Sequence, residues 1–346
     1  MLAMNPISLP NALLNIATQH VQAILSAAIE YHPAQRALLV FDADSELALI
    51  LTEAYRRCLP NANFIPFNTQ SSQAVLAAFE QLTAGDLVVL IQSTSFRLNE
   101  FRIRVELFKR GLKVIEHPHL ARMTGAEIDC YVDSLAYDSS YYRRVGAALK
   151  QRIDVAPNAR IDSGAGAQLH FAAALESAKL NVGDYHEMLN VGGQFPIGEV
   201  FTEAQDLRAV HGQVRIFVFG DTRFAVNEPA QPITLEVEQG QVIAAHDATP
   251  EFEHVLAQIR NDEGCVWVRE LGLGLNRAFT QQRKVSDIGT YERMCGIHLS
   301  LGAKHGVYSK PYIRRATAKY HVDVFAVTEA VWLGDEQVYR DGAWIV

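Results

Sequence analysis

Two spacings of apolar residues alternate along the first 157 positions of the chain. Short, almost wholly apolar runs predict strands that are buried on both faces, as in a parallel sheet. These runs lie at 36–42, 63–67, 86–91 and 112–116. Around them, apolar residues recur near helical spacing. The helices predicted in this way lie at 8–31, 45–58, 72–82, 101–110 and 137–153. Strands that alternate with helices predict an α/β domain with a parallel, doubly wound sheet.

The pattern changes after Pro157, where glycines become frequent and short alternating runs replace most helices. Alternating apolar and polar residues predict strands at 213–220, 233–238 and 241–245, and the last two form a hairpin. A helical pattern at 251–261 interrupts them. We therefore expect two domains. These are an α/β, Rossmann-like domain at 1–157 and a β-rich (α+β), metal-binding catalytic domain at 158–346.

Composition and charge exclude several classes of partner. The chain has 346 residues, and its formal net charge of -8 comes without a run of basic residues. This argues against nucleic acid or an anionic membrane surface as the main partner. No apolar stretch approaches the roughly 18 residues that cross a bilayer, and we see no signal peptide, so we expect a cytoplasmic protein. The four cysteines are far apart, and no glycine-rich nucleotide loop follows a predicted strand.

The segment 319–325 combines the apolar bulk of a strand with two possible metal ligands, His321 and Asp323. Side chains alternate between the faces of a strand, so these two residues project from the same face. Imidazole nitrogen and carboxylate oxygen both bind Zn²⁺, Mn²⁺, Co²⁺ or Fe²⁺. A hydrogen-bonded pair at a sheet edge is the commoner reason for such a pattern. The metal interpretation therefore depends on what else the chain supplies.

Two glutamates and a histidine lie beside glycines in the second half. Glu199 follows a loop shaped by proline and glycine, Glu270 ends a strand-like run, and His298 lies in an apolar run. An acid inside an apolar segment costs free energy to bury unless it is paired or bound to metal. Taken singly, a salt-bridged acid or a satisfied core histidine explains each of them. Together with His321 and Asp323, they predict a mixed nitrogen and oxygen site for one or two divalent ions.

Four short motifs carry a resemblance to a known family. They are GEVFT at 198–202, ELGLG at 270–274, GIHLSLG at 296–302 and HVD at 321–323. In order and spacing, they resemble the ligand segments of the thermophilic metalloaminopeptidases of the aminopeptidase T/S type. The α/β first half is similar to that family as well.

The resemblance implies a two-metal site that holds Zn²⁺, Co²⁺ or Mn²⁺. The ligands that it implies are Glu199, Glu270, His298, His321 and Asp323. In such a site the metals polarise the carbonyl and activate a water, which cleaves an N-terminal peptide bond or a small amide. Glu199 would also take part in catalysis. A small-molecule or short-peptide substrate and a homodimer are further implications.

The chain departs from the family at the position of the catalytic tyrosine. Counting the same distance from His298 reaches His305. We expect either that His305 acts as the acid/base group or that Tyr308 or Tyr312 replaces the tyrosine. A member that kept the ligands and lost the acid/base group, and so became a metal-stabilised binding subunit, is a further interpretation.

The same fold family includes the 2,5-dihydroxypyridine dioxygenases, which resemble this chain at 116–123 and 233–240. His298, His321 and Asp323 satisfy the two-histidine, one-carboxylate formula for Fe²⁺. Those enzymes carry a histidine where Glu270 stands, no acid at Glu199, and a first-domain histidine near 93–98 that is absent here. The two glutamates therefore favour the hydrolase, and the mononuclear iron dioxygenase is the alternative.

Other polar residues are weaker candidates. A guanidinium or ammonium group can hold a substrate carboxylate, although a solvated basic face explains each one as well. Those that fit are Arg277, Lys310, Arg314 and Arg315. His117 and His119 follow a predicted parallel strand, at the end where ligands of α/β sheets collect. Ordinary loop histidines are the simpler interpretation of that pair.

Overall fold

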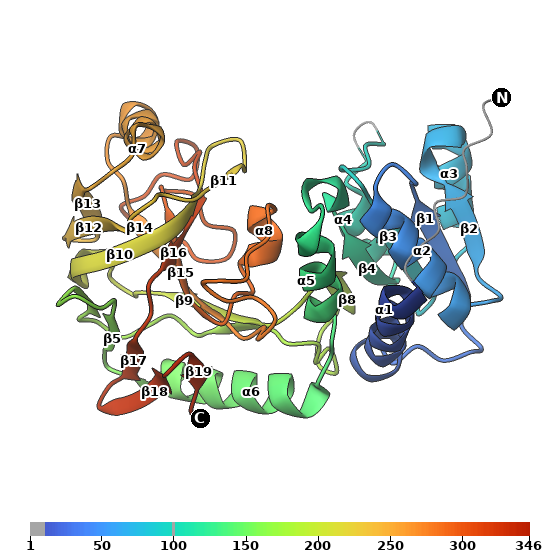
Figure 1. Ribbon diagram of the computed structural model, residues 1–346, viewed down its shortest axis with the longest axis horizontal. Coiled ribbons are helices and arrows are strands. Elements are labelled where there is room, and N and C mark those ends of the chain that lie inside the picture. Colours follow the sequence, from blue (N-terminus) through green and yellow to red (C-terminus); the bar gives the residue numbers. More distant parts are fainter. Residues whose placement is uncertain (1–10, 99–100) are drawn as a thin grey trace. The chain divides into compact units, whose positions relative to one another are not determined.

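The computed structural model describes residues 11–98 and 101–346. Its contacts divide the chain into two units (Figure 1). The first unit is Met1–Ser139 with Gly183–Ile197, and the second is Ser140–Val182 with Gly198–Val346. This division differs from the expected single boundary at residue 157. A helix that was expected in the first domain belongs to the second unit, and a later segment returns to the first.

Helix α6 (Ser139–Val155) belongs to the second unit because small residues bring it close to that unit's chain. A Cβ at Gly146 of α6 would lie 2.7 Å from Val182 Cγ1, and a Cβ at Gly198 would lie 2.5 Å from Tyr142 Cε1. Both approaches are closer than real Cβ contacts allow. Apolar periodicity alone predicts the helix but does not reveal which unit it packs against.

The first unit contains a parallel sheet, as the alternation of strands and helices predicts. Its order is β2 (Asn63–Pro66), β1 (Ala37–Phe41), β3 (Leu87–Ile91), β4 (Lys113–His117) and β8 (Gly192–Gln194). The first four strands coincide with the predicted runs. Strand β8 was not predicted, because its glycines carry no apolar pattern and the sequence places it far from the other strands.

Helices lie on both faces of this sheet, which confirms the doubly wound arrangement. They are α1 (Asn11–Ala23, extended by the π-helical turn η1, Ile24–Ala28), α2 (Glu46–Cys58), α3 (Ser72–Glu80), α4 (Ile103–Lys109) and α5 (Ala126–Ser134). The expected start of the first helix at 8–10 lies outside the described residues. Ser45 caps α2 as predicted, accepting a hydrogen bond from the Ala48 N–H. Helix α5 was not predicted.

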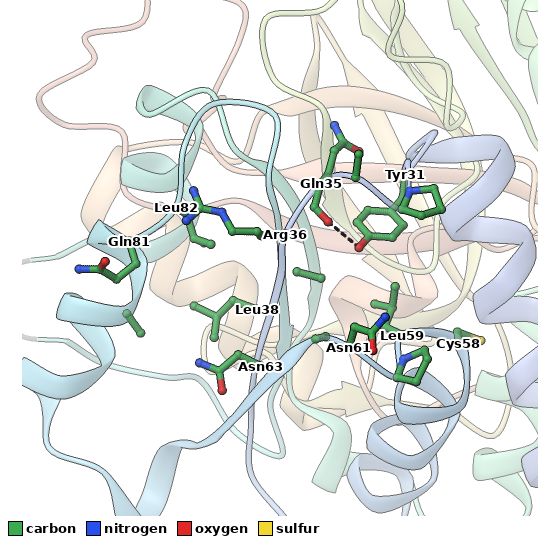
Figure 2. A pocket seen from close by; sticks show the side chains of 16 residues that line it. Tyr31, Gln35, Arg36, Leu38, Cys58, Leu59, Asn61, Asn63, Gln81 and Leu82 are labelled. Carbon is green, nitrogen blue, oxygen red and sulfur yellow. Dashed lines mark hydrogen bonds between the residues drawn. The ribbon is translucent and has the colours of Figure 1, made fainter.

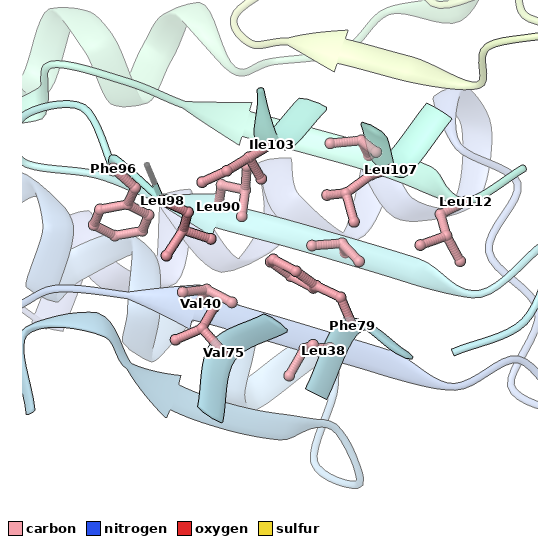
Figure 3. Close-up of a cluster of buried hydrophobic side chains, with 12 residues drawn as sticks. Leu38, Val40, Val75, Phe79, Leu90, Phe96, Leu98, Ile103, Leu107 and Leu112 are labelled. Carbon is pink, nitrogen blue, oxygen red and sulfur yellow. The ribbon is translucent and has the colours of Figure 1, made fainter. Parts of the chain in front are cut away.

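A buried apolar cluster joins one face of the sheet to α3 and α4 (Figure 3). Leu38, Val40 and Leu90 come from the strands, while Phe79 and Leu107 come from the two helices. On the other side, α1 contacts α2 and α5. Both faces of the strands are therefore covered, which explains their nearly continuous apolar sequence.

The second unit contains a large antiparallel sheet, in agreement with the β-rich prediction. Its order is β19 (Ala343–Trp344), β18 (Glu336–Arg340), β17 (Ala330–Leu333), β5 (Ala159–Asp162), β6 (Gln168–Phe171), β10 (Val210–Gly220), β16 (Val322–Ala326), β15 (Gly296–Leu301), β14 (Val268–Gly274), β9 (Glu199–Glu203) and β7 (Lys179–Asn181). Strand β10 also pairs with β11 (Val226–Asn227) and with β12 (Ile233–Glu238). Strand β12 forms the predicted hairpin with β13 (Gln241–His246). Helices α7 (Pro250–Glu263) and α8 (Ile288–Tyr291) interrupt the strands.

Short 3₁₀ turns complete the described secondary structure: η2 (Phe67–Thr69), η3 (Leu120–Arg122) and η4 (Leu207–Ala209). Within residues 11–98 and 101–346, every helix is too short or too polar to cross a membrane.

Candidate metal centre

Four neighbouring strands of the second unit, β9, β14, β15 and β16, carry four of the five candidate ligands. Gly274 of β14 pairs with Glu199 of β9, and Gly272 of β14 pairs with His298 of β15. The register of β16 against β15 places Asp323 on the same face as His298. Cross-strand partners and residues two apart share a face of a sheet. Motifs that are far apart in the sequence therefore present their side chains together.

Glu270 lies inside a strand, not at the end of a run 265–268 as the sequence pattern suggested. Strand β14 spans Val268–Gly274, and its register against β15 shifts by one residue between Val268 and Leu271. Such a bulge redirects a side chain without ending the strand. The Glu270 N–H donates to Ser300 Oγ at 3.0 Å, which fixes the bulge against β15.

Gly272 has no side chain, and the imidazole of His298 occupies the space that a side chain would take. A Cβ on Gly272 would lie 2.0 Å from His298 Cε1 and 2.1 Å from Nε2. The ring therefore lies across the backbone of β14, where a residue with a side chain would displace it. This contact explains the first glycine of the motif ELGLG at 270–274.

Glu199, Glu270 and His298 offer one ligand atom each, and these atoms lie within 4.8 Å of one another. His298 Nε2 is 3.3 Å from Glu199 Oε1 and 3.4 Å from Glu270 Oε1. All three side chains are buried, with exposed fractions of 5%, 8% and 1%. The structure thus brings together three of the five expected ligands as one compact group.

The electrostatics of this group favour a cation. Burial opposes a charge on His298, but the carboxylates of Glu199 and Glu270 outweigh it and raise the pKa of the imidazole to about 10. Burial likewise opposes a charge on Glu270, yet the imidazoles of His298 and His305 hold the pKa of its carboxyl well below its usual range. Among the described residues, neither ring nitrogen of His298 has a hydrogen bond of good geometry. An orphaned imidazole between two carboxylates fits a divalent ion with nitrogen and oxygen ligands.

His321 and Asp323 form the predicted pair, although His321 precedes strand β16 instead of lying within the strand. His321 Nε2 is 3.1 Å from Asp323 Oδ1. Its Nδ1 is 3.2 Å from the carbonyl oxygen of Lys304, so Nδ1 carries the proton. Burial opposes a charge on His321, but the Asp323 carboxylate raises the pKa of the ring to about 10. When the ring is neutral, a histidine held in this way presents its Nε2 lone pair, which is the usual arrangement of a metal-binding histidine. Buried Asp323 Oδ1 also lacks a hydrogen bond to any described residue.

His305 lies in the loop between β15 and β16, with the opposite tautomer. Its Nδ1 accepts the N–H groups of Val307 at 3.1 Å and Tyr308 at 3.2 Å. A nitrogen that accepts two hydrogen bonds is unprotonated, so Nε2 carries the proton. Nε2 lies 2.9 Å from Glu270 Oε2, and the side chain is only 2% exposed. Among the described residues, however, His305 Nε2 has no hydrogen bond of good geometry. The two rings therefore differ at Nδ1, which accepts hydrogen bonds in His305 and donates one in His321.

The two tyrosines near His305 use their hydroxyl groups elsewhere. Tyr308 donates to the carbonyl oxygen of Ser177 at 2.7 Å, and burial raises the pKa of its hydroxyl. Tyr312 donates to Asp206 Oδ1 at 3.0 Å and accepts the N–H of Leu207. The geometry therefore favours His305 over either tyrosine as the proton-bearing group beside the carboxylates.

Two residues beside the centre were not predicted. Arg293 Nη1 lies 3.3 Å from Glu199 Oε2, and the guanidinium also pairs with Glu292. Burial and the neighbouring Asp323 raise the pKa of Glu292 to about 8, although Arg293 opposes the shift. These residues follow α8 in a segment without a motif. Only the tertiary structure reveals them.

The weaker candidates lie in other environments. Lys310 is buried in ion pairs, and His117 is buried between Tyr55 and Tyr131. His119 Nε2 lies 2.7 Å from Ser95 Oγ, and the Arg277 guanidinium lies 4.0 Å from the centre of the Tyr141 ring. Arg314 and Arg315 are exposed.

A cavity of about 660 Å³ lies in the first unit, near the amino-terminal ends of β1 and β2 (Figure 2). Its lining combines apolar side chains such as Leu38 and Leu82 with the amides of Asn61 and Asn63. Such a lining offers hydrogen bonds but none of the acid and imidazole groups that bind metal. The second unit therefore holds the stronger candidate.

Comparison with known proteins shows a shared fold with a solved structure and no match at the level of sequence. No protein-family profile and no curated protein sequence matches the chain. Among solved structures, wild-type AmpT from Thermus thermophilus matches with a TM-score of 0.58, over 96% of this chain and 99% of that chain. The sequence identity is 13%, so the likeness shows a shared two-domain α/β fold and nothing finer. This finding agrees with the fold expected from the resemblance described above.

Proposed function

We propose that this protein is a metal-dependent hydrolase that cleaves an N-terminal peptide bond or a related small amide. The observation that carries the proposal is the buried group of Glu199, Glu270 and His298 on one face of the antiparallel sheet. The fold shared with AmpT, a thermophilic aminopeptidase, supports it. The substrate would be a short peptide or small amide, and a homodimer remains part of the proposal.

Glu199, Glu270 and His298 would hold the first divalent ion, and the pair of His321 and Asp323 supplies donors for a second. When bound, a divalent metal such as Zn²⁺, Co²⁺ or Mn²⁺ polarises a carbonyl and lowers the pKa of a bound water to near neutrality. The protein's part is to fix Glu199, Glu270, His298 and Asp323 on neighbouring strands, where their separation does not depend on the ordering of a loop, while His321 directly precedes β16.

His305 would act as the acid/base group. Its Nε2 lies 2.9 Å from Glu270 Oε2, beside the proposed ligands, and has no hydrogen bond of good geometry to any described residue. A proton on Nε2 that no hydrogen bond fixes can pass to the leaving amine of a cleaved amide. The two backbone N–H groups on Nδ1 hold the ring so that this proton stays on Nε2.

The test is metal content followed by activity. Protein purified without added metal and without oxygen is analysed for bound metals. It is then loaded with Zn²⁺, Mn²⁺ or Co²⁺ and offered dipeptides and aminoacyl amides. We expect hydrolysis that a chelator abolishes and added metal restores. Glu270→Gln should lose metal, whereas Glu236→Gln, at a half-exposed acid paired with His246 on β13, is the matched control.

Two outcomes would contradict the proposal. Hydrolysis that persists after complete removal of metal would exclude the metal-activated water. A single iron per chain, together with oxygen-dependent cleavage of a dihydroxypyridine ring, would instead support the dioxygenase that the two-histidine, one-carboxylate pattern suggests.

A further inference from the structure

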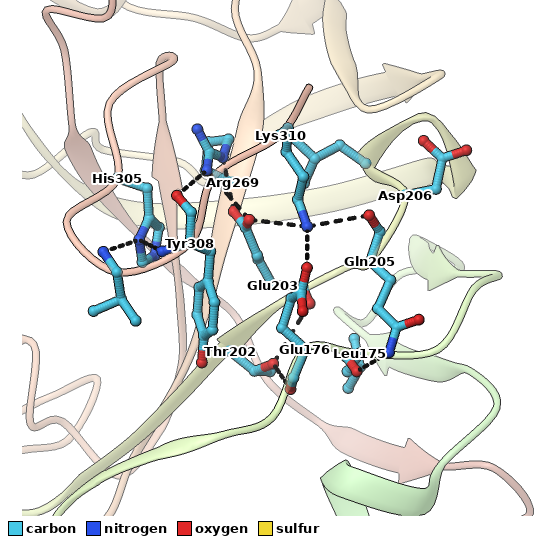
Figure 4. A network of polar contacts seen from close by, with 12 residues as sticks. Leu175, Glu176, Thr202, Glu203, Gln205, Asp206, Arg269, His305, Tyr308 and Lys310 are labelled. Atoms are coloured by element: carbon cyan, nitrogen blue, oxygen red, sulfur yellow. Dashed lines mark hydrogen bonds and ion pairs between the residues drawn. The ribbon is translucent and has the colours of Figure 1, made fainter. Parts of the chain in front are cut away.

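A cluster of buried charges lies beneath the loop that carries His305 (Figure 4). Glu203 of β9 is fully buried, and Arg269 of β14 is 2% exposed. The side chain of Lys310 is equally buried and lies 3.0 Å from Glu203 Oε1. Charges in such a place must be paired and hydrogen-bonded to remain ionised. The remaining hydrogen bonds of these side chains show which part of the backbone the cluster contacts.

The Arg269 guanidinium joins a strand to the loop. Its Nε donates to Glu203 Oε2 at 2.7 Å and its Nη2 to Glu203 Oε1 at 3.2 Å, which is a bidentate pair. The remaining donors reach two backbone carbonyls of the loop. Nη1 donates to Ala303 O, and Nη2 also donates to Tyr308 O at 3.2 Å. Arg269 therefore fixes both ends of the short segment that contains His305.

The same segment sets the state of the His305 ring. Arg269 holds the Tyr308 backbone through its carbonyl, and the N–H of Tyr308 donates to His305 Nδ1 at 3.2 Å. That bond and the one from Val307 keep Nδ1 unprotonated. Nε2, which lies 2.9 Å from Glu270 Oε2, then carries the proton. The contacts run without a break from the buried guanidinium to the candidate acid/base group.

We propose that Arg269 is a positioning residue, which fixes the orientation and the tautomer of His305 through the backbone of 303–308. This inference rests on the proposed function for its catalytic meaning, but the structural claim stands by itself. Arginine suits the task because a planar fork can bind a carboxylate and two carbonyls at once. A lysine ammonium group is a single point of charge and cannot span them.

Lys310 provides a matched comparison within the same cluster. Its ammonium group contacts Glu203 at 3.0 Å, Glu176 at 2.6 Å and the carbonyl oxygen of Gln205 at 3.1 Å. These partners lie on β9 and its neighbouring segments, and none of them belongs to 303–308. Lys310 thus shares the burial and the charge of the cluster, but it does not hold the backbone around His305.

The experiment compares Arg269→Lys with Lys310→Arg, because both variants conserve charge. Long-range ¹H–¹⁵N correlation spectra of the Zn²⁺-loaded protein distinguish protonated from unprotonated ring nitrogens. His305→Gln identifies the signal of His305 by its loss. We expect an unprotonated Nδ1 and a protonated Nε2 in the wild type and in Lys310→Arg. In Arg269→Lys this pattern should give way to an average of the two tautomers.

Turnover of Arg269→Lys gives a second measurement of the same positioning role. If the chain hydrolyses amides, Arg269→Lys should lower kcat roughly 10–100-fold, the range found for partners that orient a metal site, with KM and metal content unchanged. A wild-type His305 spectrum in Arg269→Lys would overturn the proposal, and so would equal loss of the pattern in both variants. If Arg269→Lys does not fold, the double variant Arg269→Met with Glu203→Leu removes this buried ion pair as a whole, leaves Lys310 paired with Glu176 and the carbonyl of Gln205, and gives the same readout.

The spectra separate this proposal from the proposed function. A wild-type chain that hydrolyses no amide refutes the hydrolase, yet the His305 tautomer still reports whether Arg269 sets it. Conversely, an active hydrolase whose tautomer is indifferent to Arg269→Lys retains its function and refutes only the positioning role.

Discussion

Replacing Gly272 by alanine tests the geometry of the centre most directly. The new Cβ would lie 2.0 Å from His298 Cε1, so the ring must move by about 1.4 Å, the difference between 2.0 Å and an ordinary contact of 3.4 Å. The backbone at Gly272 is not in the left-handed region, so alanine itself brings no strain there. The strand is paired on both sides, to β9 and β15, so the imidazole yields before the backbone does.

That displacement is large compared with what coordination tolerates. Zinc–nitrogen bonds are about 2.0–2.1 Å and tolerate deviations of about 0.2 Å. A ring moved by 1.4 Å therefore ceases to be a ligand. We expect the metal affinity to fall by more than the roughly 10–100-fold that follows loss of an outer-shell partner. The metal-free protein should lose only about 1–3 kcal/mol of stability, the usual cost of overpacking a core.

Isothermal titration with Zn²⁺ measures the first quantity, and urea unfolding of the metal-free protein measures the second. Gly306→Ala is the matched control, because a Cβ there meets nothing within 4 Å and its φ is not positive. If Gly272→Ala binds Zn²⁺ as tightly as the wild type, His298 is not a ligand in the position described here.

Three further predictions address other residues. Glu270→Gln should reduce metal occupancy while leaving the fold intact, as elemental analysis and circular dichroism would reveal; full occupancy would remove Glu270 from the ligands. His305→Phe should leave metal bound and lower kcat roughly 100-fold or more, the contribution of a general acid, and turnover that survives would exclude that role. Burial lowers the pKa of His117 to about 3 from 6.5, so the unfolded chain takes up a proton first as the pH falls. Between pH 7 and pH 5, urea unfolding should show that the wild type loses about 2 kcal/mol more stability than His117→Gln.

Much of the first unit follows from local sequence. Each strand from β1 to β4 is a short apolar run, and burial on both faces is what makes such a run visible. Strand β8 cannot be predicted from local sequence, because it pairs through its backbone and carries no apolar pattern. A Cβ on Gly192 would lie 2.0 Å from Val114 O, so the residue that permits the pairing is also the one that erases the pattern. Helix α5 was missed for a different reason, since the apolar residues Ile128, Tyr131 and Leu135 do recur at helical spacing and were overlooked.

For the candidate centre, the sequence predicts the identity of the candidate ligands but not the distances between them. Residue type and strand alternation place Glu199, Glu270, His298 and Asp323 among the candidate ligands, because each lies in a short motif. Their mutual distances depend on the register of β9, β14 and β15, which no local pattern reveals. The bulge at Glu270 is a further case, since a single extra residue changes the direction of the side chain while the sequence still reads as an ordinary strand.

The tautomers of the two loop histidines are beyond any motif, and they assign different chemistry to identical side chains. His321 donates its Nδ1 proton to Lys304 O, which leaves Nε2 free to bind metal. His305 accepts at Nδ1 from Val307 and Tyr308, which leaves a proton on Nε2 and excludes ligation through that nitrogen in the neutral ring. A backbone carbonyl in one case and backbone N–H groups in the other make the difference. The proposed roles of His321 as ligand and His305 as acid thus depend on the main chain of the loop between β15 and β16, and the buried Arg269 is the side chain that holds that main chain beside His305.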